Sequence, residues 1–357
     1  NKKYIMATIL LRSPYYETHS QAYASPNVAK SATITLSVGG TLISEMSKDT
    51  VLTATSTANQ ETGTISFEIA DLCRDYLDIT FNNSYTPQFI SITGTLVFKN
   101  KTVDEINTGA SGVAPVGSSV SIAHKGLDGY YEFMEGTGTG QNSAKTIAQN
   151  DLLIDTTLTT SRNNPPTGNT VQLYYPDNTA GQIPYWDGST IVYSSFTATA
   201  TTATVISTVF VINRVCNKHT AYKVTFVNKY GALQDFYFNG KTTEDIKVST
   251  TKFKRNINNT SFEYDKQKHS IKQFNTLANE GLILNTPPMS YDSVNESMKQ
   301  LLVSEQVWIR KVMGGSEQTV PIIITSNQQT IKTGLNDKVI QYTITAEYAF
   351  DFISNIR

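Results

Sequence analysis

The chain has few of the residues that build disulfide scaffolds or metal centres. It contains two cysteines, Cys73 and Cys216, and four histidines among 357 residues. Two cysteines so far apart argue against a disulfide framework, and the apolar neighbours of Cys73 predict a buried thiol. None of the histidines has a partner at metal-ligand spacing, so we expect no metal or other cofactor.

Charge is also scarce, at 17% of residues against about 25% in an average soluble protein. The 29 basic and 30 acidic residues give a formal net charge of -1. A protein that neutralises many phosphates needs a strongly basic balance. The composition therefore disfavours a nucleic-acid partner.

Long apolar runs are missing as well. No stretch approaches the roughly 20 apolar residues of a membrane span, so we expect no membrane association. The apolar segment Ile5–Leu11 follows two lysines but is short, and no small-residue cleavage site follows it. It predicts a first strand rather than a signal peptide.

No motif in the chain specifies a reaction. The glycine-rich stretch Gly136–Gly140 lacks the Gly-Lys-Ser/Thr ending of a phosphate-binding loop and predicts a flexible loop. Ser249 and Lys252 match a serine–lysine acyl-transfer spacing, but that motif needs a helix start, and β-branched neighbours predict a strand here. We therefore assign no catalytic residue and expect no enzyme.

Aromatic residues are plentiful, with 19 tyrosines and 15 phenylalanines. Aromatic and β-branched residues fit pleated surfaces, so the composition predicts an all-β protein of antiparallel sandwich or barrel domains with one or two short helices. The clearest single strand closes the chain. Between Ile340 and Phe352 every second residue is apolar and most of the others are polar, which is typical of a half-buried strand.

The length predicts two or three domains. Residues 104–121 are rich in Gly, Ala and Ser and contain a proline, which is typical of a loop or linker. We place an N-terminal β-domain at 1–110, a middle sandwich-like domain at 122–216 and a C-terminal β-domain at 217–357. Changes of hydrophobic period predict short helices near 71–77 and 293–303.

The middle region contains a cluster of aromatic residues beside a carboxylate. Aromatic rings stack on the apolar faces of sugars and carboxylates accept hydrogen bonds from hydroxyls, so the cluster is a candidate glycan-binding site. Its members are Tyr174, Tyr175, Tyr185, Trp186 and Asp187. The alternative is ordinary core packing. A glycoside hydrolase also stays open, because the separation of two carboxylates cannot be read from a sequence.

A basic stretch with interleaved phenylalanines runs from Val248 to Lys272. It indicates either a contact face, for another subunit or for nucleic acid, or a solvated strand pair that Glu263 and Asp265 partly neutralise. The candidate subunit-contact residues are Lys252, Lys254, Arg255, Lys266 and Lys268.

Several segments resemble structural tail proteins of tailed bacteriophages, in the distal-tail or baseplate group. The segments that resemble them are Tyr222–Gly231, Gln300–Ile309, Leu335–Lys338, Phe67–Leu77 and Asp128–Tyr130. From the spacing of these segments, the resemblance extends over about 40% of the chain. The middle region resembles nothing known, which leaves room for an added binding domain.

This resemblance implies a virion component without catalysis that is assembled in the host cytoplasm. Such proteins form rings around the tail axis and connect the tail tube to fibres or baseplate parts. The implied partners are other copies of the chain and other tail proteins, and a host surface glycan could be a further one. The alternative is a carbohydrate-binding surface protein that uses the middle aromatic cluster.

Overall fold

A computed structural model describes residues 7–24, 29–54, 60–101, 113–128, 132–133, 144–145, 151–154, 171–205, 208–215, 218–257, 261, 263–289, 294–313, 316–326, 328, 330 and 340–350. Strands account for 62% and helices for 6% of the structure. The sheets are mostly antiparallel, and the two described helices are short. The predicted β-dominated fold class is therefore confirmed.

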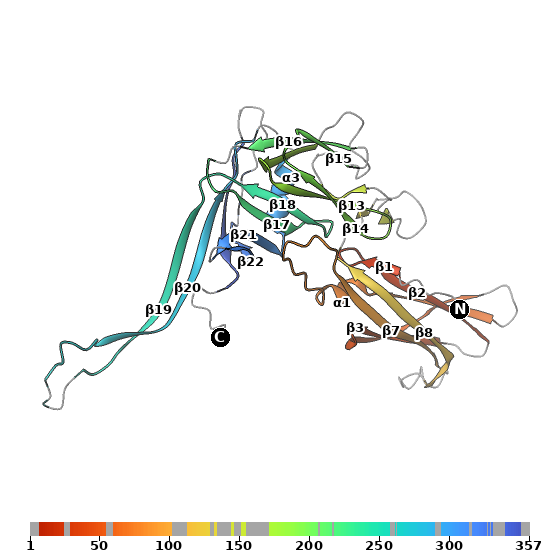
Figure 1. The fold of residues 1–357 in the computed structure, drawn as a ribbon. Helices are drawn as coiled ribbons and strands as arrows, with labels where there is room; N and C mark the ends of the chain where they lie inside the picture. The colour runs from red at the N-terminus through yellow and green to blue at the C-terminus, as the bar shows by residue number, and fades with distance from the viewer. Residues whose placement is uncertain are drawn as a thin grey trace.

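The N-terminal part is a sandwich of two sheets (Figure 1). The first sheet has the order β1 (Ala7–Leu10), β8 (Val113–Leu127), β7 (Phe89–Lys101), β3 (Ala29–Val38) and β4 (Thr41–Asp49). The second has the order β2 (Tyr16–Ala24), β6 (Gln60–Glu68) and β5 (Val51–Ala54). Ile34 and Ile92 from the first sheet and Phe67 from the second meet in one buried cluster. Alternate residues of each strand thus fill the space between the sheets.

The short helix α1 (Ala70–Arg74) closes one end of this sandwich. Its Ala70 and Cys73 are buried in the same cluster, so both the helix predicted near 71–77 and the buried thiol are confirmed. Glu68 accepts hydrogen bonds from the backbone N–H groups of Ala70 and Asp71 at 3.0 and 3.3 Å. These bonds satisfy N–H groups that a helix start leaves unpaired.

The middle part consists of two small three-stranded sheets. One has the order β11 (Asp151–Leu152), β13 (Ala180–Trp186) and β14 (Ile191–Thr197). The other has the order β12 (Val171–Pro176), β16 (Thr208–Val215) and β15 (Thr202–Val205). Ile183 and Phe210, one from each sheet, share a buried cluster. A separate two-stranded sheet joins β9 (Glu132–Phe133) and β10 (Ala144–Lys145).

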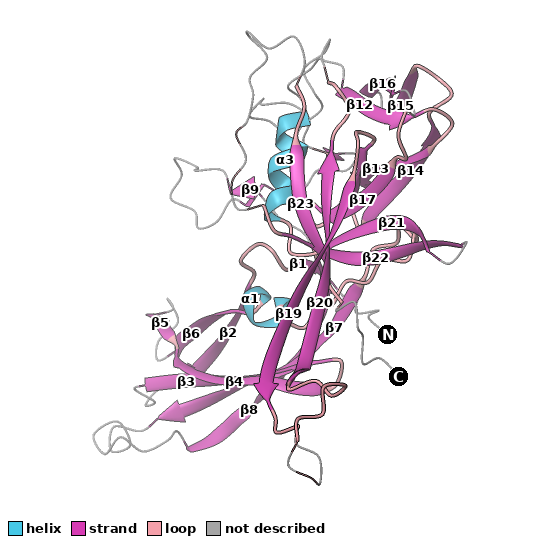
Figure 2. Ribbon diagram, turned by 90° about the vertical axis from the view of Figure 1, so that its left-hand side faces the viewer, coloured by secondary structure: helices cyan, strands magenta, loops and turns pink. Residues whose placement is uncertain are grey.

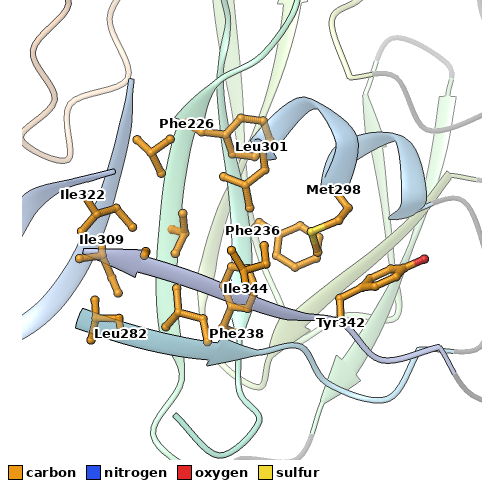
Figure 3. Packing of buried hydrophobic residues seen from close by; sticks show 14 of the residues in the cluster. Phe226, Phe236, Phe238, Leu282, Met298, Leu301, Ile309, Ile322, Tyr342 and Ile344 are labelled. Atoms are coloured by element: carbon orange, nitrogen blue, oxygen red, sulfur yellow. The ribbon is translucent and has the colours of Figure 1, made fainter. Parts of the chain in front are cut away.

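The C-terminal part is a seven-stranded antiparallel sheet that curls around the largest buried cluster. Its order is β18 (Leu233–Phe238), β17 (Tyr222–Val227), β21 (Val307–Met313), β22 (Ser316–Ile324), β23 (Thr343–Tyr348), β20 (Ile271–Asn285) and β19 (Thr243–Lys254). Helix α3 (Val294–Val303), which confirms the helix predicted near 293–303, lies beside β23 (Figure 2). Its Met298 and Leu301 pack against Phe236, Ile344 and Tyr342 in this cluster (Figure 3).

The closing strand follows the predicted alternation over its described length. Tyr342, Ile344 and Tyr348 are buried, and Thr343 and Thr345 between them are exposed. The strand is shorter than predicted, because β23 ends at Tyr348 and Phe350 is 49% exposed. The predicted last residue, Phe352, lies outside the described residues.

A strand occupies much of the predicted linker 104–121. β8 begins at Val113 and pairs with β7 from Asn100 to Phe89. The register shifts near Pro115, where a residue without a backbone N–H is tolerated. The prediction of a loop was wrong for this half of the segment, because the neighbouring strand and not the local composition decides whether its backbone is paired.

Two buried clusters join the three parts of the chain. Leu10, Trp186 and Tyr230, one from each part, pack in one of them. Phe81 packs with Trp308 in the other, with ring centroids 5.7 Å apart. The loop between α1 and β7 and the turn after β17 therefore hold the parts against one another.

Candidate functional sites

The most conspicuous surface feature is a long hairpin formed by β19 and β20, which we call the arm. Figure 1 shows it projecting away from the rest of the protein. The two strands stay paired from Thr243–Ile283 at the root to Lys254–Ile271 at the far end. β20 is anchored by the buried Leu282 and Leu284, whereas β19 is exposed along nearly its whole length. The arm is thus held by the core at one end only.

The arm carries apolar side chains that the protein itself leaves uncovered. Six of them are exposed to between 42% and 57%: Ile246, Val248, Phe253, Ile271, Phe274 and Leu277. Phe253 pairs with Lys272 and Phe274 with Thr251, which places both rings on one face. Their centroids are 5.5 Å apart in an edge-to-face arrangement. Phe253 and Phe274 therefore form an exposed aromatic pair on the arm.

The five predicted subunit-contact residues lie together at the far end of the arm. They are Lys252, Lys254, Arg255, Lys266 and Lys268, and all five are exposed. Lys268 forms an ion pair with Asp265 at 3.0 Å, and the Arg255 Nε donates to the carbonyl of His269 at 3.0 Å. The structure therefore brings the basic set together, as a solvated strand pair whose end is positively charged.

The predicted glycan-binding residues do not form one surface. Tyr175 and Trp186 are only 4% and 6% exposed, and they belong to different buried clusters. Tyr174 and Tyr185 pack against two further clusters. Asp187 accepts hydrogen bonds from the backbone N–H groups of Ser189 and Thr190, both at 2.8 Å, and so shapes the β13–β14 turn. The middle aromatic residues serve as packing between layers.

A cavity of about 680 Å³ opens where the three parts of the chain meet. Its walls come from the loop residues Asn83 and Tyr85, the β12–β13 turn at 176–182, and strands β17, β18, β21 and β22. This volume is within the range of about 300–1,000 Å³ that is typical of small-molecule sites. Sequence reasoning did not find this cavity, because it is assembled from segments far apart in the chain.

A buried polar network supports one wall of the cavity. The Tyr85 hydroxyl lies 2.7 and 2.6 Å from the two carboxylate oxygens of Asp235, and Lys223 Nζ donates to the Tyr85 oxygen at 2.6 Å. Thr225 donates to Asp235 at 2.7 Å. Burial raises the pKa of Asp235 and lowers that of Lys223, and their mutual attraction opposes both shifts. The signal for this network in the sequence is a lysine in one strand, β17, and an aspartate in the next strand, β18.

A second polar cavity, of about 460 Å³, lies between α1 and the loop before β21. Arg12 Nη2 donates to Asp128 Oδ2 at 2.8 Å in its wall. Arg74 pairs with Glu305 at 3.1 Å, with the Glu305 side chain 70% exposed. Each of these two cations has an acidic partner, so the charges named in this wall are balanced.

Glu17 on β2 accepts hydrogen bonds from two histidines in a small buried cluster of the N-terminal sandwich. His19 Nε2 lies 2.6 Å from one of its carboxylate oxygens and His124 Nε2 lies 2.8 Å from the other. The ring of Tyr15 packs edge-on against His124. Burial alone would raise the pKa of Glu17, but the hydrogen bonds from both histidines lower it below its ordinary value.

The remaining observations concern other chemistry and membrane insertion. Among them there is no group of three or more His, Cys, Asp or Glu side chains placed to hold a metal ion. Ser249 and Lys252 lie within strand β19 and not at the start of a helix. Gly136–Gly140 and Cys216 lie outside the described residues. No helix in the described ranges is long and apolar enough to span a membrane.

Comparisons with protein-family models, with curated proteins and with solved structures find no match for this chain.

Proposed function

We propose that this protein is a structural component of a bacteriophage tail, in the distal-tail or baseplate group. It assembles with copies of itself into a ring and links the tail tube to neighbouring tail parts, without catalysis. Its place is the virion, and it is assembled in the host cytoplasm. The observation that carries this proposal is the arm, with its uncovered apolar side chains and basic end.

The arm needs a partner for physical reasons. A two-stranded hairpin is only marginally stable in water unless a further layer covers it. Exposed apolar groups that gather on one element are typical of protein interaction surfaces. The Phe253–Phe274 pair is such a group, and it lies in the same region as the basic end.

β19 is also one of the two edge strands of the seven-stranded sheet. Its outer row of backbone N–H and C=O groups can pair with a strand of another chain. When each copy offers an arm to the next copy, the contacts are head-to-tail, and such contacts close into a ring if the rotation permits it. A chain with one projecting arm fits this kind of assembly.

Electron microscopy and light scattering of the purified full chain test the assembly. We expect the wild type to form closed rings and the double variant Phe253→Ser, Phe274→Ser to remain monomeric. The matched control is Leu42→Ser, which removes an exposed apolar side chain of β4 and should leave the rings intact. A monomeric wild type at high concentration would refute the ring, and so would rings formed by the double variant.

Immunogold labelling of the tailed particles tests the location separately. Label at the end of the tail supports the proposal. Label confined to the head, or none on intact particles, would overturn it even if the purified protein forms rings.

A further inference from the structure

The sheet face that lines the large cavity carries a row of polar residues across four strands. Tyr237, Lys223, Arg310 and Thr319 are directly opposite one another on β18, β17, β21 and β22. Directly paired residues point to the same face of a sheet. This is the face opposite the hydrophobic core, because the alternate residues Val224 and Ile309 are fully buried in that core.

Two polar atoms of this row are buried without a hydrogen-bond partner among the described residues. They are the Nε of Arg310 and the hydroxyl oxygen of Thr319. An unsatisfied buried donor costs about 1–3 kcal/mol, so a group of this kind calls for an explanation such as a binding function. Of these two residues, only Arg310 lines the cavity, and its Nη2 pairs with Glu317.

The cavity wall presents donors that suit a carboxylate. Lys223 and Arg310 are paired across β17 and β21. Asp235 lies 3.8 Å from Lys223 Nζ and Glu317 pairs with Arg310 Nη2, so the donor left for a ligand is the Nε of Arg310, which has no partner among the described residues. The third basic residue of the wall, Lys311, is engaged elsewhere, with Glu244 at 2.7 Å and the Tyr348 hydroxyl at 3.0 Å. Arginine favours planar carboxylates because its N–H groups match their geometry.

The rest of the lining suits a hydroxylated ring. Tyr85 and Tyr237 contribute aromatic rings, which stack on the apolar faces of sugars. Asn83, Asn178 and Gln182 add side-chain amides, which both donate to and accept from hydroxyl groups. Aromatic rings, amides and a paired cation together select a sugar that bears an acid group over a plain anion.

We propose that this cavity binds a carboxylated sugar. Its carboxylate accepts a hydrogen bond from the Nε of Arg310, and its ring lies among the tyrosines and amides. This site differs from the aromatic set Tyr174 to Asp187 predicted from the sequence, and it does not depend on ring assembly.

Isothermal titration of the full chain with D-glucuronate, D-glucose and sulfate tests the proposal. We expect glucuronate to bind and glucose to bind at least about tenfold more weakly, because glucose lacks the carboxylate and a charge-assisted hydrogen bond is worth about that factor or more. Sulfate should also bind more weakly, because it has no ring to contact the tyrosines and amides. No binding of glucuronate would overturn the proposal. Equal binding of glucose would remove the role of the carboxylate, and equal binding of sulfate would leave only a simple anion site. Either result would also overturn it.

Two variants connect the binding to these residues. Arg310→Gln should weaken glucuronate binding about tenfold or more, since it removes a charged donor. Gln182→Glu places a negative charge at a partly exposed lining position, where the fold tolerates it, and should also weaken glucuronate but not glucose. The matched control Arg74→Gln breaks an exposed arginine–glutamate pair and should bind as the wild type does. Wild-type affinity in Gln182→Glu or in folded Arg310→Gln would refute the site.

Discussion

Lys223 and Arg310 are directly opposite residues of the neighbouring strands β17 and β21, although both are positively charged. Like charges in this position destabilise a sheet unless acidic groups offset them. Asp235 lies 3.8 Å from Lys223 Nζ, and Glu317 pairs with Arg310. On the sheet face that lines the large cavity, each of these two positive charges is therefore offset by an acidic side chain.

The Lys223–Asp235 pair should be strongly coupled in stability. Asp235→Leu leaves a buried lysine without its acid, and we expect a loss of about 3–5 kcal/mol in the free energy of unfolding. Adding Lys223→Met removes that charge, so the double variant should be more stable than the single one. Urea unfolding measures both. The exposed Glu305→Gln should change stability by less than about 1 kcal/mol. Strictly additive losses at 223 and 235 would contradict the coupling.

The Glu17 cluster should make stability depend on pH in the acidic range. Its folded pKa lies below the ordinary value of 4.5 because His124 and His19 donate to it, although burial opposes this. The stabilisation is therefore fully present above pH 4.5 and is lost as the pH falls through the folded pKa.

Urea unfolding of the wild type and Glu17→Gln from about pH 7 to about pH 3 measures this term. The difference in stability between them should shrink as the pH falls. Glu45→Gln, at an exposed position of β4, is the control and should follow the wild type. A constant difference across the range would show that the carboxylate of Glu17 does not contribute in this way.

Helix α3 should contribute to stability through one face only. Leu301 is fully buried in the C-terminal cluster, and Val303, two residues later, is 82% exposed. We expect Leu301→Ala to lower the free energy of unfolding by about 2–5 kcal/mol. Val303→Ala should change it by less than about 0.5 kcal/mol. Equal effects in a thermal or urea melt would mean that the helix does not pack as described.

Cys73 should be chemically inert in the folded protein. It is fully buried in the N-terminal cluster, and burial raises its pKa to about 11, with the negative charge of Glu68 adding to the effect. The thiolate is the reactive form, so alkylation should be very slow near neutral pH. A Cys216→Ser variant isolates the thiol of Cys73, and its alkylation should become fast in urea. Rapid labelling without urea would contradict the burial.

Local pattern was enough to predict the strands and helices of this chain where one face meets a core. The alternation from Ile340 to Tyr348 and the helical spacing around Met298 and Leu301 both appear as buried faces. Phe350 was predicted to continue the apolar face, yet it is exposed. Its burial depends on whether a neighbouring strand extends that far, which no local pattern records.

The sequence by itself determined the fold class, the two helices and the basic character of residues 252–268, because periodicity and charge are local properties. Only the tertiary structure decided that Tyr175 and Trp186 are buried packing and that the five cations lie at the end of a projecting arm. It also placed Tyr85 against Asp235, 150 residues away. Strand pairing brings such distant residues into contact, and the resulting cavity belongs to no single segment of the chain.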